Sequence, residues 1–165
     1  MGRDPDALDT PAIRAIAVSD VPHRVVRTVR ARTAAEAADL QGIPSSALLR
    51  TIVVRRGDGD YLFVVLPAGR RFDWPRLRDH LGVRRLTLPD ADEARAVTGY
   101  ERYTITPYGS TTAWPVIVDA AAMSEPIVSI GGGGFGVSLH LAPADLVASL
   151  GAAVADVSDP EPVAG

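Results

Sequence analysis

Residues 51–66 of this chain read TIVVRRGDGDYLFVVL, and this stretch decides the class of fold. Two runs rich in β-branched and aromatic residues flank Gly57–Asp60, a glycine- and aspartate-rich sequence that is a strong β-hairpin signal. The run Val64–Leu66 is apolar at consecutive positions. Such a pattern is typical of a strand covered on both faces, so the hairpin is predicted to be a buried part of a sheet.

Helix and strand signals alternate on both sides of this hairpin. Thr10-Pro11 predicts a helix start, and Thr33–Glu36 is a capping box that begins another helix. Similar signals predict five helices, at about residues 10–19, 33–42, 73–81, 90–98 and 142–150. Short apolar runs predict further strands, at about residues 23–29, 83–88, 116–118, 127–130 and 136–141. The expected fold is therefore α/β, with a mixed, barrel-like β-sheet flanked by helices.

Length and composition indicate one globular domain. The chain has 165 residues, of which 47% are hydrophobic and 22% charged, and this length ordinarily forms one core. We expect a disordered N-terminal extension over residues 1–9, a single domain over 10–158 and a frayed tail over 159–165. No apolar run approaches the 18 residues of a membrane span, and the amino end lacks the apolar stretch of a signal peptide. A cytoplasmic protein without a membrane partner is expected.

The chemistry available to the chain is limited by what it lacks. It has no cysteine, and its three histidines, His23, His80 and His140, show no metal-ligand spacing. We therefore expect neither a metal nor another cofactor. His140 could act as a base, but a solvated histidine on a strand is the favoured interpretation. Without a nucleophile motif, any hydrolysis here would use an activated water or the substrate's own groups.

Charge is unevenly distributed along the sequence. All 17 basic residues are arginine, and the net charge is −3. The segment from Arg50 to Arg85 holds nine arginines against four aspartates, whereas the chain from Leu86 onward holds two arginines against ten acids. The basic segment could attract a phosphate backbone, or its arginines could simply cover solvated faces. Both interpretations stay open.

Two loops are candidates for binding. Gly131–Gly136 matches a dinucleotide-binding pattern, but the residues that follow alternate as a strand rather than opening a helix. A wide loop with amide donors for a ligand is the better hypothesis, and a mobile connection is the alternative. The second loop, Tyr103–Ser110, concentrates hydroxyls, aromatics and a proline. It could line a small polar pocket and stack a base, or it could be an ordinary surface turn.

Six segments, in this order and at matching spacing, resemble the YbaK/prolyl-tRNA synthetase-associated family: Thr10–Ile13, Thr33–Ile43, Leu49–Val54, Thr98–Tyr100, Ile105–Gly109 and Leu141–Leu146. The resemblance covers about residues 10–158. It implies an α/β fold with a mixed, barrel-like sheet and an enzyme that deacylates mischarged tRNA, typically prolyl tRNA carrying cysteine or alanine. The implied partners are mischarged tRNA and an aminoacyl-tRNA synthetase. A non-catalytic relative that binds aminoacyl-tRNA or a small anion is the alternative.

The resemblance also implies the site. The family carries a lysine where this chain has Arg50, two glycines at Tyr103-Thr104, and a small residue at Gly131. Arg50 could supply charge and hydrogen bonds but not a base, because arginine keeps its proton. Amides near Gly131–Gly133 and at Thr106 would stabilise the oxyanion. The implied catalytic residues are Arg50, Thr106 and Gly131, and the implied substrate-binding residues are Thr28, Thr51, Tyr103, Thr104, Pro107, Gly109, Gly132, Gly133 and Asp145.

Overall fold

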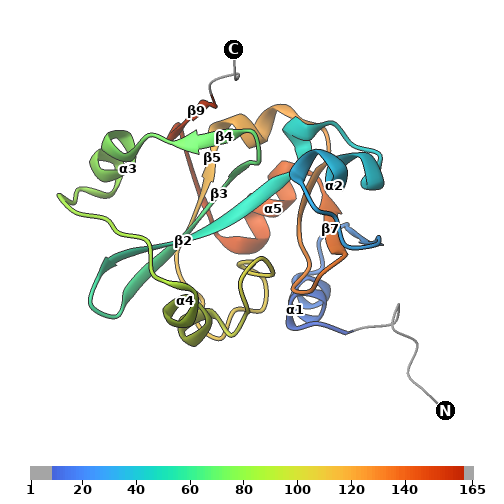
Figure 1. Cartoon of the computed structure of the whole chain (residues 1–165), viewed down its shortest axis with the longest axis horizontal. Helices are drawn as coiled ribbons and strands as arrows, with labels where there is room; N and C mark the ends of the chain where they lie inside the picture. Colours follow the sequence, from blue (N-terminus) through green and yellow to red (C-terminus); the bar gives the residue numbers. More distant parts are fainter. Residues whose placement is uncertain (1–8, 162–165) are drawn as a thin grey trace.

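The computed structural model describes residues 9–161 and shows a mixed α/β architecture (Figure 1). The strands are β1 (Arg24–Arg27), β2 (Leu49–Gly57), β3 (Asp60–Pro67), β4 (Arg70–Phe72), β5 (Val116–Asp119), β6 (Val128–Gly131), β7 (Val137–Leu141), β8 (Ala153–Ala155) and β9 (Ser158–Pro160). The α-helices are α1 (Pro11–Ser19), α2 (Ala34–Gln41), α3 (Trp74–Leu81), α4 (Ala91–Thr98) and α5 (Pro143–Leu150). Two 3-10 helices, η2 (Ser45–Ala47) and η3 (Ala120–Ser124), complete the set.

The strands of the described part form three sheets. The largest has the order β2-β3-β5-β8, in which β2 pairs with β3 antiparallel while β3-β5 and β5-β8 are parallel. A second sheet has the order β1-β7-β6, and β4 pairs with β9. One isolated parallel bridge, between Leu48 and Ser129, links the first two sheets. The mixed sheet is confirmed, but the barrel-like closure is not, because residues 9–161 form separate sheets rather than a closed barrel.

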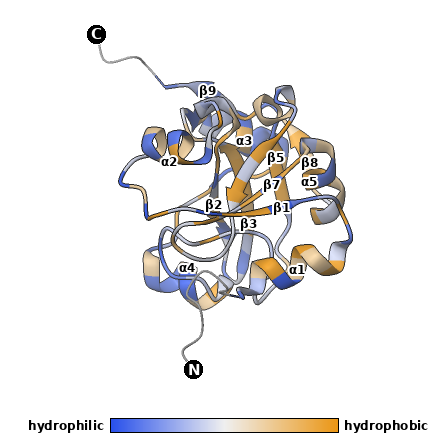
Figure 2. Cartoon of the chain, turned by 90° about the vertical axis from the view of Figure 1, so that its right-hand side faces the viewer, coloured by the Kyte–Doolittle hydropathy of each residue, from blue (hydrophilic) through white to orange (hydrophobic). Residues whose placement is uncertain are grey.

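The predicted hairpin forms β2 and β3 at the centre of the molecule, and β3 is buried on both faces. On one face Leu62 and Val64 pack with Leu77 of α3. On the other face Phe63 and Val65 join the larger core cluster, to which α1, α4 and α5 also contribute. Figure 2 shows hydrophobic residues concentrated on the central strands and hydrophilic residues on the outer parts of α2 and α4. Burial of alternate residues on opposite faces explains the continuous apolar run.

The helix starts predicted at Thr10 and Thr33 are confirmed, and two further helices have caps of the same kind. In each case a side-chain oxygen accepts a hydrogen bond from the backbone amide three residues later, which satisfies one of the free amides of the first helical turn. The capping residues are Thr10 for α1, Thr33 for α2, Asp73 for α3 and Asp90 for α4.

Three expectations need correction or fall outside the described residues. The strand predicted at 83–88 does not form, because only Thr87 pairs there, in an isolated bridge with Arg55. Asp159 and Pro160, expected in a frayed tail, are paired with β4 as part of β9. Residues 1–8 and 162–165, which contain most of the predicted extension and the rest of the tail, lie outside the described residues. In the described part, no helix is long and apolar enough to cross a membrane.

Candidate functional site

Two neighbouring cavities share a wall at the start of β2. The larger has a volume of about 900 Å³ and the smaller about 710 Å³. Four residues line both cavities: Leu49, Arg50, Tyr103 and Gly131. The fold thus brings the start of the hairpin, the hydroxyl-rich loop and the glycine run to one place, although they lie far apart in the sequence.

The predicted site residues divide into two groups. Arg50, Tyr103 and Gly131 line both cavities. Thr28, Thr104 and Gly133 also line the larger cavity, and Thr51 lines the smaller one. The remaining predicted residues line neither of these two cavities: Thr106, Pro107, Gly109, Gly132 and Asp145.

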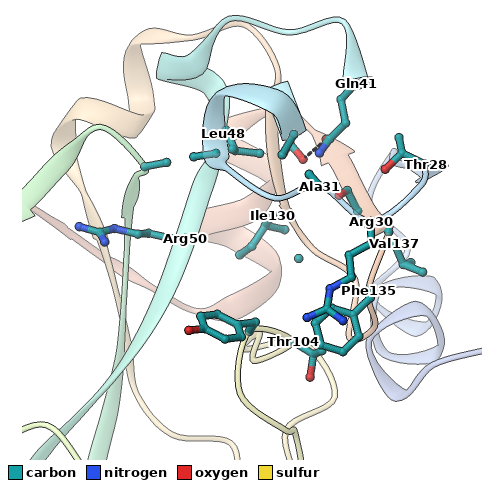
Figure 3. Close-up of a pocket in the computed structure, with 18 of the residues that line it drawn as sticks. Thr28, Arg30, Ala31, Gln41, Leu48, Arg50, Thr104, Ile130, Phe135 and Val137 are labelled. Atoms are coloured by element: carbon teal, nitrogen blue, oxygen red, sulfur yellow. Dashed lines mark hydrogen bonds between the residues drawn. The ribbon is translucent and has the colours of Figure 1, made fainter. Parts of the chain in front are cut away.

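Arg50 lines both cavities, and its guanidinium contacts the neighbouring strand β4. Its guanidinium donates a hydrogen bond to the carbonyl oxygen of Arg70 and lies 3.9 Å from a carboxylate oxygen of Glu161. In Figure 3 the side chain extends away from Ile130 and the centre of the larger cavity. Its buried Nε has no hydrogen-bond partner among the described residues. The charge is therefore available at the rim but is not centred in the cavity.

Tyr103 has an unusual backbone for its residue type. Its φ is +72°, in the left-handed region that glycine adopts without a steric penalty. Its side chain is 77% exposed, and the Arg102 guanidinium lies 4.9 Å from its ring centroid. A glycine at this position, as in the family pattern, would fit the same backbone without strain. The tyrosine instead adds a ring to the wall between the two cavities.

The glycine loop connects β6 to β7 as a hairpin, so the rejection of a dinucleotide-binding helix is confirmed. The Gly132 amide donates a hydrogen bond to the carbonyl oxygen of Val137. The amides of Gly133, Gly134 and Phe135 make no hydrogen bond to any residue that the structure describes. These amides, unlike that of Gly132, are therefore free donors in this loop.

Ile105 lines the smaller cavity, and residues 106–109 that follow it line neither cavity. Thr106 and Pro107 are buried. A Cβ atom at Gly109 would lie 2.4 Å from the carbonyl carbon of Pro11, so only glycine allows this approach to α1. The Tyr108 hydroxyl forms a hydrogen bond with Ser149, and burial raises the pKa of Tyr108 to about 12. This part of the loop fixes the position of Tyr103 and Thr104 rather than forming the wall.

Asp145 lies in the first turn of α5, where a carboxylate interacts favourably with the helix dipole. It also contributes to the raised pKa of Tyr108, as a negative charge does for a neighbouring phenol. Asp145 is half-buried beside this loop and lines neither cavity.

A hydrogen-bonded group of three side chains lies at the larger cavity, which Gln41 and Ser129 line and His140 does not. The side-chain oxygen of Gln41 accepts a hydrogen bond from the Ser129 hydroxyl and lies 2.8 Å from Nε2 of His140. His140 is only 8% exposed, which corrects the expectation of a solvated histidine. Burial lowers the pKa of His140, and the positive charge of Arg24 lowers it further. His140 therefore favours its neutral form more than a free imidazole does, and its Nε2 contacts Gln41, which lines the cavity.

Arg30, Arg32 and Phe135 are among the residues of the larger cavity that sequence reasoning missed. The available signal was the pair of arginines directly between a predicted strand and a capping box. Phe135 also interrupts the glycine run as its one bulky member. Their approach depends on the pairing of β1 with β7, which the sequence does not specify.

The electrostatic character of the larger cavity is positive. Arg30, Arg32 and Arg50 line it, and no aspartate or glutamate from residues 9–161 does. No cluster of three histidine, aspartate or glutamate side chains suited to a metal ion occurs in the described part of the chain. The arrangement suits an anionic ligand held by guanidinium groups and backbone amides.

The basic segment 50–85 contributes less than its charge suggests. Five of its nine arginines form ion pairs with carboxylates, namely Arg50, Arg55, Arg56, Arg70 and Arg76. Only Arg50 of the nine lines the larger cavity. The segment is mainly a set of paired surface arginines.

Comparison with known proteins gives consistent results. The chain is similar in structure to a crystal structure described only as a hypothetical protein, with a TM-score of 0.82 and 29% identity, covering 90% of this chain and 99% of the other. It is also similar to one provisionally described as a trans-editing enzyme for prolyl tRNA synthetase, with a TM-score of 0.83 and 26% identity, covering 93% and 99%. Residues 28–148 match the aminoacyl-tRNA editing domain. Because this match spans most of the chain, the protein belongs to the aminoacyl-tRNA editing domain family, as its resemblance to YbaK implied.

Proposed function

We propose that this editing domain acts in trans and hydrolyses the ester that joins a wrong amino acid to the terminal adenosine of tRNA. The observation that carries the proposal is the wall of the larger cavity, which contains three arginines and no carboxylate from the described residues. This occurs in a chain whose net charge is −3. A positive cavity on an acidic protein selects a negatively charged ligand such as the end of a tRNA.

The size of the site agrees with such a substrate. Ligand pockets commonly have volumes of about 300 to 1,000 Å³, and the larger cavity has about 900 Å³. An adenosine with its ester could occupy this space. The smaller cavity, which meets it at Tyr103, is lined mainly by apolar side chains and could receive the amino-acid part.

The reaction requires a nucleophile and a place for the developing negative charge. A water oxygen attacks the ester carbonyl carbon, and the bond between this carbon and the ribose oxygen breaks. The departing ribose oxygen takes up a proton that the attacking water loses. For a cysteinyl substrate its own thiol sulfur could attack the carbonyl carbon instead. The ribose oxygen then leaves with the thiol proton, and water opens the resulting thiolactone. The charge of Arg50, which lines both cavities, is the group that could stabilise the oxyanion.

The substrate that we propose is prolyl tRNA wrongly charged with cysteine or alanine. The family resemblance and the structural similarity to a protein described as a trans-editing enzyme for prolyl tRNA synthetase support this choice. A small amino acid also suits a site in which Tyr103 takes the place of a family glycine. The partners would then be mischarged tRNA and a synthetase, and the reaction would take place in the cytoplasm.

The test is deacylation of purified tRNA. Prolyl tRNA charged with cysteine, alanine or proline is incubated with the protein, and an active member of the family is assayed in parallel. Loss of cysteine or alanine, with proline retained, is the expected result. If none of the three esters is cleaved above background while the active relative works, the proposal is wrong.

A second function is favoured by the position of Arg50. Its guanidinium is bound to Arg70 and lies near Glu161, so it could be a structural group in a non-catalytic protein that binds aminoacyl-tRNA or a small anion. In that case the parent is inert, and Arg50→Lys restores hydrolysis. Equilibrium binding of tRNA and of inorganic phosphate at low and moderate salt separates the two ligands, because contacts to many phosphates weaken steeply with salt.

A further inference from the structure

Arg30 and Phe135 form a stacked pair on the wall of the larger cavity. The guanidinium carbon of Arg30 lies 3.8 Å from the centroid of the Phe135 ring, which is a cation–π contact. Both residues line the cavity. In Figure 3 the two side chains meet at one end of the pocket, and Arg50 lies at the opposite end.

The fold fixes this pair in place. β1 pairs with β7 antiparallel, and the Thr28 amide donates to the Gly136 carbonyl at 2.8 Å. A Cβ at Gly136 would lie 2.2 Å from the Thr28 carbonyl oxygen, so the two segments can approach only because position 136 is glycine. The residues just beyond this contact are Arg30 on one segment and Phe135 on the other. Their contact follows from backbone pairing as well as from side-chain attraction.

The surroundings of the pair favour a planar ligand with a nearby negative charge. Phe135 is 39% exposed, so its ring is accessible to a ligand. The amides of Gly133 and Gly134, two and one residues before it, have no partner among the described residues. A phosphate alone would need the guanidinium and these amides but not an aromatic ring. The exposed ring therefore favours a ligand that also has a flat π-system, which can stack on it.

A second arginine–aromatic pair borders the same site. Arg102 and Tyr103 line the smaller cavity, with the guanidinium 4.9 Å from the ring centroid. The two cation–π pairs among the described residues both line these cavities. Aromatic and arginine side chains on a positive surface are the usual elements of single-stranded nucleic-acid binding.

We infer that Arg30 and Phe135 form a stacking platform for a nucleobase of the unpaired 3′ end of the tRNA. The inference rests on the proposed function and adds to it a binding subsite. The base lies against the exposed Phe135 ring, and the free amides of Gly133 and Gly134 face the adjoining phosphate. Arg50, at the other end of the pocket, is left near the ester.

Binding of an RNA strand that carries no amino acid tests the platform without any reaction. The probes are a short single-stranded RNA with a 3′ adenosine and the same strand with an abasic 3′ residue, each measured by fluorescence anisotropy. Base–aromatic stacking contributes roughly 1–3 kcal/mol, so the wild-type protein should bind the adenosine strand about 5- to 160-fold more tightly. Equal affinity for the two strands overturns the inference, and this result needs no variant.

Variants then assign the preference to the ring. Phe135→Ala and Phe135→Leu should both reduce the preference to within about twofold, because leucine keeps an apolar side chain without the π-system. Binding of the abasic strand, and the salt dependence of binding, should stay unchanged. Arg78→Gln, on α3 and outside both cavities, is the control for general effects of surface charge. A preference that survives in Phe135→Ala overturns the assignment, and thermal unfolding verifies that each variant is folded.

Deacylation is measured separately, so that the two proposals fail independently. If the wild type cleaves no ester but still prefers the adenosine strand, the proposed function is lost and the base subsite is supported. If it cleaves the ester without preferring the adenosine strand, only the subsite is lost. For an active protein, Phe135→Ala should raise KM about tenfold and change kcat less than twofold.

Discussion

The guanidinium of Arg50 donates a hydrogen bond to the backbone carbonyl oxygen of Arg70, rather than pointing to the centre of the cavity that Arg50 lines. A group held in this way can act on a substrate at the rim. If Arg50 stabilises the developing oxyanion, Arg50→Ala should lower kcat/KM by about 100-fold, the usual cost of losing one such group. Single-turnover deacylation of mischarged tRNA measures the change.

Arg71→Ala is the matched control for this prediction. Arg71 follows Arg70 in β4, is exposed and lines neither cavity. Its removal should change the rate less than twofold. A rate for Arg50→Ala that equals that of Arg71→Ala would remove Arg50 from the mechanism.

The backbone of Tyr103 predicts a gain in stability on substitution by glycine. The left-handed conformation costs a non-glycine residue roughly 1–2 kcal/mol, and Tyr103 has a φ of +72°. Tyr103→Gly and Tyr103→Ala both remove the exposed ring, but only the first relieves the backbone. Urea denaturation should give Tyr103→Gly a free energy of unfolding about 1 kcal/mol above that of Tyr103→Ala. Equal values would show that the strain is absent.

Asp119 predicts a large loss of stability. This carboxylate is 1% exposed and accepts hydrogen bonds from the amides of Ala121 and Val157 and from the Ser158 hydroxyl. Asp119→Ala leaves these buried donors unpaired and should cost about 3–5 kcal/mol in urea denaturation. Asp156→Ala, which breaks the exposed ion pair with Arg76, should cost less than about 1 kcal/mol. Similar losses for the two variants would contradict this assignment.

Local features could be predicted from the sequence because their causes are local. The cap at Thr33 needs only the amide of Glu36, and the hairpin turn needs only the glycines and aspartates between two β-rich runs. The short strands β4 and β9 could not be predicted in this way. Each has three residues, and β9 is anchored by the distant Asp119 through Ser158.

The candidate site shows the same difference between features that depend on local sequence and features that depend on distant contacts. Arg50 and Gly131, which the family resemblance indicated as site residues, both line the larger cavity. The direction of the loop after Thr104 was not predictable, because it depends on the close approach of Gly109 to Pro11. Phe135 was missed for a similar reason: its partner Arg30 lies in the segment after β1, more than 100 residues earlier in the chain.

The environment of His140 predicts a pH-dependent contribution to stability. Burial and the charge of Arg24 lower the pKa of His140 in the folded protein, whereas the unfolded chain should have the ordinary value of about 6.5. Below that pH the unfolded state binds a proton that the folded state does not, so the free energy of unfolding falls as the pH is lowered. Above it both states are neutral, and the contribution is constant.

His140→Gln removes the titrating group, while its side-chain amide can still donate a hydrogen bond to Gln41. The difference in unfolding free energy between wild type and His140→Gln should therefore move against the wild type as the pH falls from 7.5 to 5.5. His80→Gln, at an exposed position on α3, controls for the loss of an imidazole. Urea denaturation at three pH values measures both differences. The difference in unfolding free energy between wild type and His140→Gln could instead stay constant across this range. His140 would then have the same pKa in the folded and unfolded states, and its burial would not oppose protonation.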